Sequence, residues 1–267
     1  MDLPAVSLTT RRGLTLVDLL VALVLLGLLG TAVSRALISQ RRATGILLER
    51  DQAFGTLDQA SAWLVAELAE LGRADGATDL IRLGADSLSY RAFRSAGLAC
   101  LVATNEVRIR RDQQTLWRIP QAGRDSLLMF LTTDSAPGHG TWAALAISSV
   151  SGSSCAGHPA LRFGTNIDAS RLTGLPPYVP VRTFEIMQLR LYRSQGDWWL
   201  GARSESAGEA IQPVTGPFSP RGLRLTYYDS VGREVADPAL VRQVELRLFP
   251  ARPGDSARVK VQPRNLR

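Results

Sequence analysis

Histidine and cysteine, two residue types that often carry catalysis or bind metals, are scarce in this chain of 267 residues. It has two histidines, His139 and His158, and two cysteines, Cys100 and Cys155. Cys155 and His158 have C-x-x-H spacing, but a structural zinc site usually has four protein ligands, and only Cys100 and His139 remain to complete it. We therefore expect no metal and no cofactor, and we interpret both histidines as solvated loop residues.

Motifs of the common enzyme classes are also absent from the sequence. The chain has no G-x-S-x-G elbow, no G-x-x-x-x-G-K-S/T phosphate loop and no H-E-x-x-H pair. Ser153 and Ser154 lie close to His158 in sequence, which does not bring a nucleophile and a base together in space. An aromatic strand with one of Trp198 and Trp199 pointing inward is a simpler interpretation than a sugar site. These absences favour a protein that is not an enzyme.

A single carboxylate lies in the longest apolar segment of the chain. Between residues 14 and 34 the only charged side chain is that of Asp18. At about 1.5 Å per residue, a helix of this length can cross a hydrocarbon core about 30 Å thick. An unpaired Asp at the centre of such a helix costs about 2.5 to 3.5 kcal/mol. We therefore expect Asp18 to meet either water or a cationic group.

A secretory signal peptide is the alternative interpretation of this segment. Arg11 and Arg12 form a positive stretch ahead of the apolar run, as in a signal peptide. The apolar region of a signal peptide usually has only about 7 to 15 residues, and no convincing small-residue cleavage site follows this longer one. Arg35, Arg41 and Arg42 lie beyond the run, so charge bias does not decide its orientation.

The junction at Gly13 resembles the processing site of type IV prepilins and type II secretion pseudopilins. Gly13 is followed by Leu14, Thr, Leu, Val and then Asp18, where the family pattern is G, F, T, L, a variable residue and E. The resemblance implies that a prepilin peptidase cleaves between Gly13 and Leu14 on the cytoplasmic side and methylates the amino group of Leu14. It also implies that Asp18 is the assembly carboxylate, which meets the N-terminus of a neighbouring subunit. Two departures are Leu14 for the usual Phe or Met, and Asp18 for the usual Glu.

The sequence after the apolar run keeps the periodicity of a helix. We predict one helix from Leu14 to about Leu71, roughly 87 Å long at 1.5 Å per residue, which stops near Gly72. A separate amphipathic helix is the alternative, because Gly45 and Gly55 each weaken helical continuity by about 1 kcal/mol relative to Ala. The predicted apolar face consists of Phe54, Leu57, Ser61, Leu64, Leu68 and Leu71, at spacings of three and four.

After residue 76 the pattern changes to short β-rich runs divided by Gly, Pro, Asp and Ser. A polar turn is predicted around Asp112 and Gln113. Residues 151–180, rich in Gly, Ser and Pro, are predicted to form a long loop or insertion, and the segment from residue 252 is polar enough to fray. The predicted strands lie at residues 87–93, 106–111, 115–119, 127–132, 142–148, 184–193, 197–203, 222–229 and 240–249.

Two late segments, residues 190–203 and 222–249, resemble the closing strands of PilW-like minor pilins and J-type minor pseudopilins. In those proteins an aromatic strand, a D-x-x-G turn and a V-R-x-V strand recur, as they do here. The fold class is therefore predicted as α+β and pilin-like, with a long N-terminal helix packed on an antiparallel β-sheet domain. The predicted parts are a leader peptide (1–13), the transmembrane or filament-core half of the helix (14–38), its amphipathic half (39–72), a β-rich periplasmic head (73–251) and a polar C-terminal tail (252–267).

The net charge of +7 does not by itself indicate nucleic-acid binding. Arginines are spread along the chain, Lys260 is the only lysine, and no basic stripe is interleaved with stacking aromatic residues. We expect no nucleic-acid partner. Beyond leader and anchor, the chain is long enough to bury a core of its own.

Both cysteines follow the predicted membrane segment. An exported domain lies in an oxidising compartment, so we expect a disulfide between Cys100 and Cys155. Two buried free thiols are the alternative.

The sequence and the resemblance together predict a minor pilin or minor pseudopilin, a non-enzymatic subunit that assembles into or primes a type IV pilus or a type II secretion pseudopilus. The expected partners are prepilin peptidase, other minor and major pilins or pseudopilins contacted through the N-terminal helix, and the inner membrane. The expected location is the inner membrane, with one span and a periplasmic head, followed by the pilus or pseudopilus. The alternative is a single-pass, membrane-anchored periplasmic binding or enzyme domain.

Overall fold

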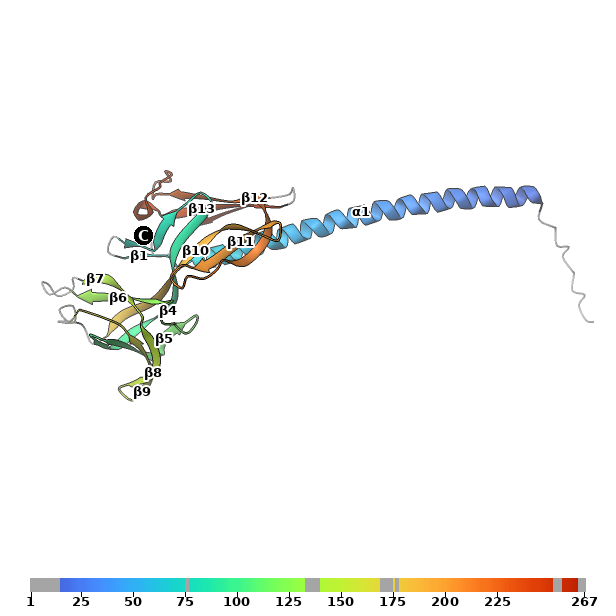
Figure 1. Cartoon of the computed structure of the whole chain (residues 1–267). Helices are drawn as coiled ribbons and strands as arrows, with labels where there is room; N and C mark the ends of the chain where they lie inside the picture. Colours follow the sequence, from blue (N-terminus) through green and yellow to red (C-terminus); the bar gives the residue numbers. More distant parts are fainter. Residues whose placement is uncertain are drawn as a thin grey trace, which may run out of the picture. The chain divides into compact units, whose positions relative to one another are not determined.

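The computed structural model describes residues 15–74, 77–132, 140–168, 175, 178–251 and 256–263 (Figure 1). The chain forms two compact units, Met1–Gln52 and Ala53–Arg267. In the first unit the described residues are helical after Thr15. The second unit contains the end of that helix and a large antiparallel sheet. The α+β class with an N-terminal helix is therefore confirmed.

The N-terminal helix α1 (Leu16–Ala69) has 54 residues and continues through Gly45 and Gly55. The prediction of one helix rather than two is confirmed, although the helix ends slightly before the predicted stop. Beyond it, the Gly72 N–H donates to the Asp79 carboxylate at 2.6 Å, and the Asp79 N–H donates to the Gly72 carbonyl at 3.0 Å. Burial raises the pKa of Asp79 to about 6, against the opposing effects of this hydrogen bond and of Arg91.

The second unit is built around a 12-stranded antiparallel sheet. Its main path runs β14-β13-β12-β11-β10-β4-β5-β9-β8, β3 pairs with β4, and β6 pairs with both β10 and β7. A separate ladder joins β1 to β2. The elements are β1 (Arg73–Ala74), β2 (Ala77–Thr78), β3 (Leu80–Leu83), β4 (Ser87–Ala103), β5 (Glu106–Leu116), β6 (Ser126–Thr132), β7 (Gly140–Ala146), β8 (Ser149–Cys155), β9 (His158–Gly164), β10 (Val179–Ser194), β11 (Asp197–Ser204), β12 (Gln212–Tyr228), the 3-10 helix η2 (Pro238–Leu240), β13 (Gln243–Pro250) and β14 (Ala257–Val261).

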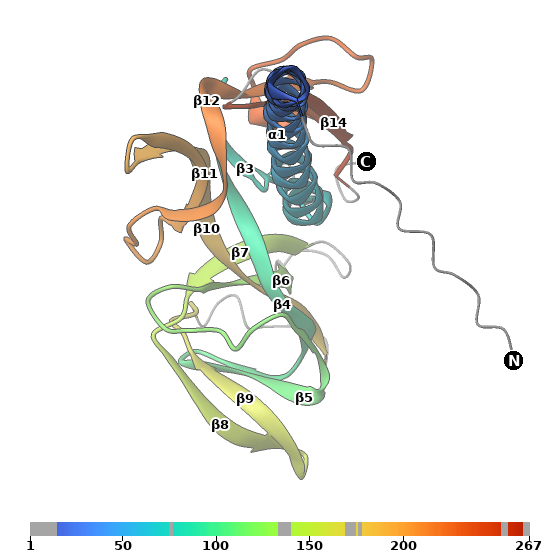
Figure 2. The same cartoon turned by 90° about the vertical axis from the view of Figure 1, so that its right-hand side faces the viewer.

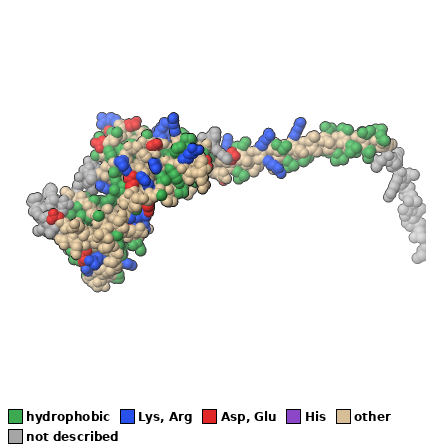
Figure 3. Space-filling model, viewed as in Figure 1, with side chains coloured by type: hydrophobic (Ala, Val, Ile, Leu, Met, Phe, Trp, Pro, Cys, Tyr) green, Lys and Arg blue, Asp and Glu red, His purple; other side chains and the backbone are tan. Residues whose placement is uncertain are grey.

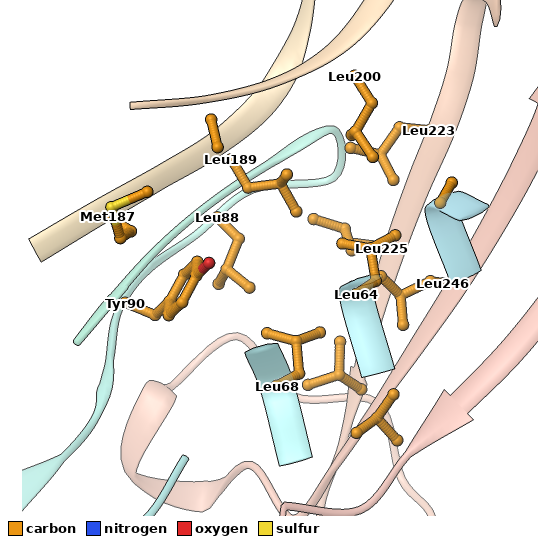
Figure 4. Close-up of a cluster of buried hydrophobic side chains, with 14 of the residues drawn as sticks. Leu64, Leu68, Leu88, Tyr90, Met187, Leu189, Leu200, Leu223, Leu225 and Leu246 are labelled. Carbon is orange, nitrogen blue, oxygen red and sulfur yellow. The ribbon is translucent and has the colours of Figure 1, made fainter. Parts of the chain in front are cut away.

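One hydrophobic core, here called the helix-covered core, lies between the end of α1 and the sheet (Figure 4). Leu64 and Leu68 of α1 are at most 1% exposed and face side chains of β4, β10, β12 and β13. The helical spacing predicted this face, except that Phe54 is 54% exposed and Ala60 is fully buried. Its main members are Leu57, Ala60, Leu64, Leu68, Leu71, Leu88, Tyr90, Leu189, Leu200, Leu223, Leu225 and Leu246.

A second core, here called the helix-free core, lies among the strands shown in the lower part of Figure 2. It includes no residue of α1. Each sheet residue points its side chain to the opposite face from its neighbour. Val107 and Ile109 of β5 are therefore buried, whereas Arg108 between them is partly exposed. Its buried members are Ala99, Val107, Ile109, Leu127, Met129, Leu131, Ala143, Ile147, Leu161, Phe163, Ile167, Val179 and Val181.

Strands β4 and β10 take part in both cores. They have 17 and 16 residues and pair with each other over most of that length. At one end Leu88 is opposite Leu189, in the helix-covered core, and at the other end Ala99 is opposite Val179, in the helix-free core. The register shifts between Thr183 and Phe184, as at a β-bulge.

In three places where a turn, a loop or a tail was predicted, the structure contains strands. The predicted turn around Asp112 is a bulge inside β5: Ile109 pairs with Ala99 and Gln114 with Gly97, so four residues of β5 oppose one of β4. The predicted long loop at 151–180 contains β8 and β9, joined through Ala156 and Gly157, which both have positive φ. Two-residue hairpin turns of this kind need a left-handed backbone. Strand β8 shows no apolar alternation in its sequence because it is a largely exposed edge strand.

The predicted polar tail also contains a strand that was not predicted. In β14 (Ala257–Val261), alternate residues are the apolar ones, and they pack against the helix-covered core. The strand pairs with β13, where Val261 is opposite Val244. The prediction that the chain frays from residue 252 is therefore wrong for residues 257–261.

A disulfide joins Cys100 of β4 to Cys155 at the end of β8, so the expected pairing is present. The two Cα atoms are 6.5 Å apart. Strands β5 and β9 lie between β4 and β8 in the sheet order, and three flat strand spacings would be about 14 Å. The sheet must therefore curl around the helix-free core to bring these strands together.

We predict that thiol labelling of the non-reduced, denatured full chain gives no reactive cysteine, and that reduction gives two. The Cys100→Ser variant, which leaves Cys155 without its partner, should label once without reduction and serves as the control for reactivity. In the chain-entropy model, closing a loop of this size stabilises the fold by about 4 kcal/mol, so the reduced protein should unfold at a lower urea concentration. Two reactive thiols before reduction would contradict the disulfide.

Candidate functional site

The first turn of α1 is held by three hydrogen bonds between Thr15 and Asp18, which run in both directions. The Asp18 Oδ2 atom accepts from the Thr15 backbone N–H at 3.1 Å and from the Thr15 hydroxyl at 2.7 Å. In return, the Asp18 N–H donates to Thr15 Oγ1 at 3.3 Å. This arrangement is a capping box, in which Thr15 is the N-cap residue and Asp18 is the third helical residue. The spacing Thr-x-x-Asp ahead of an apolar run is the sequence signal of this box.

Capping leaves part of the Asp18 carboxylate available. Both hydrogen bonds from Thr15 reach Oδ2, and within the described residues no hydrogen bond reaches Oδ1. A carboxylate in the first turn also interacts favourably with the helix dipole. Asp18 can therefore cap its own helix and still accept a hydrogen bond from another cationic or polar group.

The part of α1 that follows is exposed, and it is apolar up to about Ser34, where polar and arginine side chains begin. Every residue from 15 to 44 is exposed, including Leu16 at 76% and Leu26 at 65%. This helix contains a segment long and apolar enough to cross a membrane. A water-exposed apolar surface of this size is unfavourable, and contact with lipid or with another protein would remove it from water.

The other residues singled out in the sequence are distributed as follows. The cleavage-site residues Gly13 and Leu14, and His139, lie outside the described residues. The His158 side chain is 53% exposed at the β8–β9 turn, with Nδ1 3.9 Å from Asp112. Trp198 and Trp199 of β11 are both partly exposed, Ser153 and Ser154 lie on β8, and both cysteines are in the disulfide. Among the residues described, no three His, Cys, Asp or Glu side chains are grouped to hold a metal ion.

The structure also contains a buried ion-pair network that the sequence did not reveal. Glu185 of β10, whose side chain is 1% exposed, accepts from Arg94 at 2.5 Å and from Arg124 at 2.6 Å, and its Oε1 lies 3.0 Å from Arg118. Arg118 in turn makes two 2.7 Å hydrogen bonds to Asp125. Arg94 and Arg124 are 91 and 61 residues from Glu185 in sequence, so no local pattern indicated the network.

The same network reaches α1. Arg94 lies 3.5 Å from Glu67 of α1, and the Tyr90 hydroxyl donates to Glu67 at 3.1 Å. Burial raises the pKa of Glu185, but the hydrogen bonds from the three arginines outweigh it and lower that pKa to about 2. With both oxygens engaged and so low a pKa, Glu185 is a structural carboxylate rather than a base at neutral pH.

The chain matches no protein-family model, and comparisons with curated proteins and with solved structures find no similar protein. The exposed half of α1, the Thr15–Asp18 turn and the motif around Gly13 are therefore the features of this chain that bear on its function.

We predict that Glu185→Gln lowers the free energy of unfolding by about 3 to 5 kcal/mol at pH 7, because three guanidinium groups lose their buried carboxylate. The folded-state pKa of about 2 lies below the ordinary value of 4.5. The stabilisation is therefore complete above about pH 4.5 and is lost as the pH falls toward 2. Urea unfolding of the full chain in detergent should thus give wild-type and variant curves that converge in this range.

Glu205→Gln is the matched control, because the two arginines near Glu205, Arg82 and Arg203, have side chains that are 65% and 36% exposed, against 15 to 28% for the arginines around Glu185. Such a surface pair contributes at most about 1 kcal/mol. Equal losses in the two variants would contradict the role assigned to the buried network.

Proposed function

We propose that the chain is a minor pilin or minor pseudopilin, a non-enzymatic subunit that assembles into or primes a type IV pilus or a type II secretion pseudopilus. One observation carries the proposal: α1 (Leu16–Ala69) is a single helix whose residues up to 44 are exposed, and up to Ser34 its only charged side chain is that of Asp18, while Leu64 and Leu68 belong to the core of a β-sheet domain. A subunit that moves from membrane to filament needs a helix of this kind.

In this proposal the exposed half of α1 crosses the inner membrane first and then packs among the helices of other pilins or pseudopilins. Exchanging lipid for apolar helices brings little hydrophobic gain, since both surroundings exclude water. Close packing and the pairing of the few polar groups therefore select the partner and its register. Asp18 is the only charged side chain within the described part of the apolar segment.

Processing would create the cationic partner for Asp18. Cleavage between Gly13 and Leu14, inferred from the resemblance, frees an amino group that is mostly cationic at neutral pH and stays so after methylation. Thr15 keeps its backbone N–H after such a cut, so the capping box survives. The unoccupied Oδ1 atom of Asp18 can then accept from the new N-terminus of a neighbouring subunit.

The location follows from the same proposal. The precursor is a single-pass inner-membrane protein with a periplasmic head, and the mature subunit joins a pilus or pseudopilus. The disulfide between Cys100 and Cys155 supports an oxidising compartment for the head. The proposed partners are prepilin peptidase and other minor and major subunits.

We predict that the mature chain begins at Leu14. Intact-mass measurement and N-terminal sequencing of protein from cells with prepilin peptidase should give loss of residues 1–13 and one added methyl group. Cells that lack the peptidase should give the full-length chain. The Gly13→Leu variant should stay full-length even in cells that contain the peptidase. An intact Met1 terminus in peptidase-containing cells would refute the pilin interpretation and favour a permanently anchored periplasmic domain.

We further predict that Asp18→Asn is still cleaved but enters filaments poorly, whereas Asp18→Glu enters at least as well as the wild-type chain. Asn keeps an oxygen that can accept from Thr15 but has no charge, so this variant separates capping from pairing. Thr15→Val removes the hydroxyl and weakens the cap alone, and it is the control. Co-purification with other pilins measures the result, and wild-type incorporation of Asp18→Asn would contradict the pairing role.

A further inference from the structure

Three arginines follow the apolar part of α1 and have no partner within the described chain. Arg35, Arg41 and Arg42 are all exposed, and no described ion pair or hydrogen bond involves them. Between Asp18 and Glu49 the chain has no acidic residue. Figure 3 shows Lys and Arg side chains projecting from α1 beyond its apolar N-terminal part. No acidic residue thus lies within six positions of any of these three exposed guanidinium groups along the chain.

The helical spacing concentrates these charges. Arg35 and Arg42 are seven residues apart and lie on nearly the same side of α1, and Arg41 is adjacent to Arg42. Along the axis the three residues span about 10 Å. The polar layer on each side of a bilayer is about 5 to 8 Å thick, and flexible arginine side chains extend along the helix to reach it. Leu37 and Ile38, each 51% exposed, lie between the arginines and offer contacts to acyl chains.

We propose that Arg35, Arg41 and Arg42, here called the arginine band, bind the headgroups of anionic phospholipids at the membrane surface from which the head projects. A guanidinium group presents paired N–H donors to a phosphate and remains charged at every relevant pH. The phosphodiester of a lipid such as phosphatidylglycerol is the anion. The arginine band lies near such headgroups because it follows directly after the membrane span. This inference deepens the proposed function and rests on it only for the statement that α1 crosses a membrane.

The arginine band also fixes the depth of α1 in the bilayer. Asp18 precedes Arg35 by 17 residues, or about 26 Å along the helix axis. A hydrocarbon core is about 30 Å thick. When the band holds the headgroups on one side, Asp18 lies close to the opposite surface, where water reaches it. The lipid contact therefore keeps the unpaired carboxylate out of the bilayer centre before the subunit finds a partner.

The experiment uses the full chain in mild detergent, titrated with phosphatidylglycerol or with phosphatidylcholine, and counts bound lipids by native mass spectrometry. A cation near an anionic surface contributes about a fivefold preference, and salt screens it. Two or three such contacts together give a preference of at least about tenfold. We therefore expect the wild-type chain to bind phosphatidylglycerol at least about tenfold more tightly than phosphatidylcholine. The variant Arg35→Gln, Arg41→Gln, Arg42→Gln should have little preference.

A matched control removes the same charge elsewhere. Arg111, Arg190 and Arg224 are exposed residues of the sheet unit, and none of them forms a described ion pair. Their triple substitution by Gln should keep the lipid preference. A wild-type chain without preference, or equal losses in the two triple variants, would overturn the arginine band as a lipid site.

A loss of co-purification with other pilins in the band variant, with lipid preference unchanged, would assign the arginines to a protein partner and overturn the proposal. The N-terminus of each preparation is sequenced in parallel. An uncleaved Met1 terminus would refute the proposed function while the lipid preference is still measured, so failure of one is distinguishable from failure of the other.

Discussion

The pairing of β4 with β10 is the constraint on which the second unit depends, because among its described strands only these two contribute buried residues to both cores. At one end, Leu88 and Leu189 face the helix-covered core, and at the other end Ala99 and Val179 face the helix-free core. A one-residue slip would turn every one of these side chains to the wrong face. The register between β4 and β10 therefore decides both cores at once.

The buried Glu185 lies on this same shared strand, and its arginine partners come from β4 and from the segment between β5 and β6. Such a network contributes little net stability over apolar packing, but breaking it leaves uncompensated charge. Through Arg94 it also reaches Glu67 of α1. Ion pairs as well as apolar contacts thus join the last turns of α1 to the two strands that both cores share, which fixes the sheet on this end of the helix.

The two halves of α1 answer to different surroundings. Leu64 and Leu68 are buried by the sheet of their own chain, whereas the apolar residues before residue 45 have no such cover. Asp18, the only acid among the described residues before Glu49, is bound by Thr15 through one oxygen. In the proposed function, lipid and then neighbouring helices provide the missing cover. The cap stabilises the first turn in either environment, because its hydrogen bonds are made within the chain.

The sequence by itself determined the features that depend on local spacing: one long helix with an apolar membrane-length half, the face presented by Leu57, Leu64 and Leu68, and most strands of the sheet. The disulfide was also predictable, since only one pairing of two cysteines exists. Tertiary structure alone decided the rest. Edge strands β8 and β14 are only partly buried and carry a weak pattern, and Glu185 meets arginines 61 to 91 residues away, a proximity set by strand order rather than by spacing.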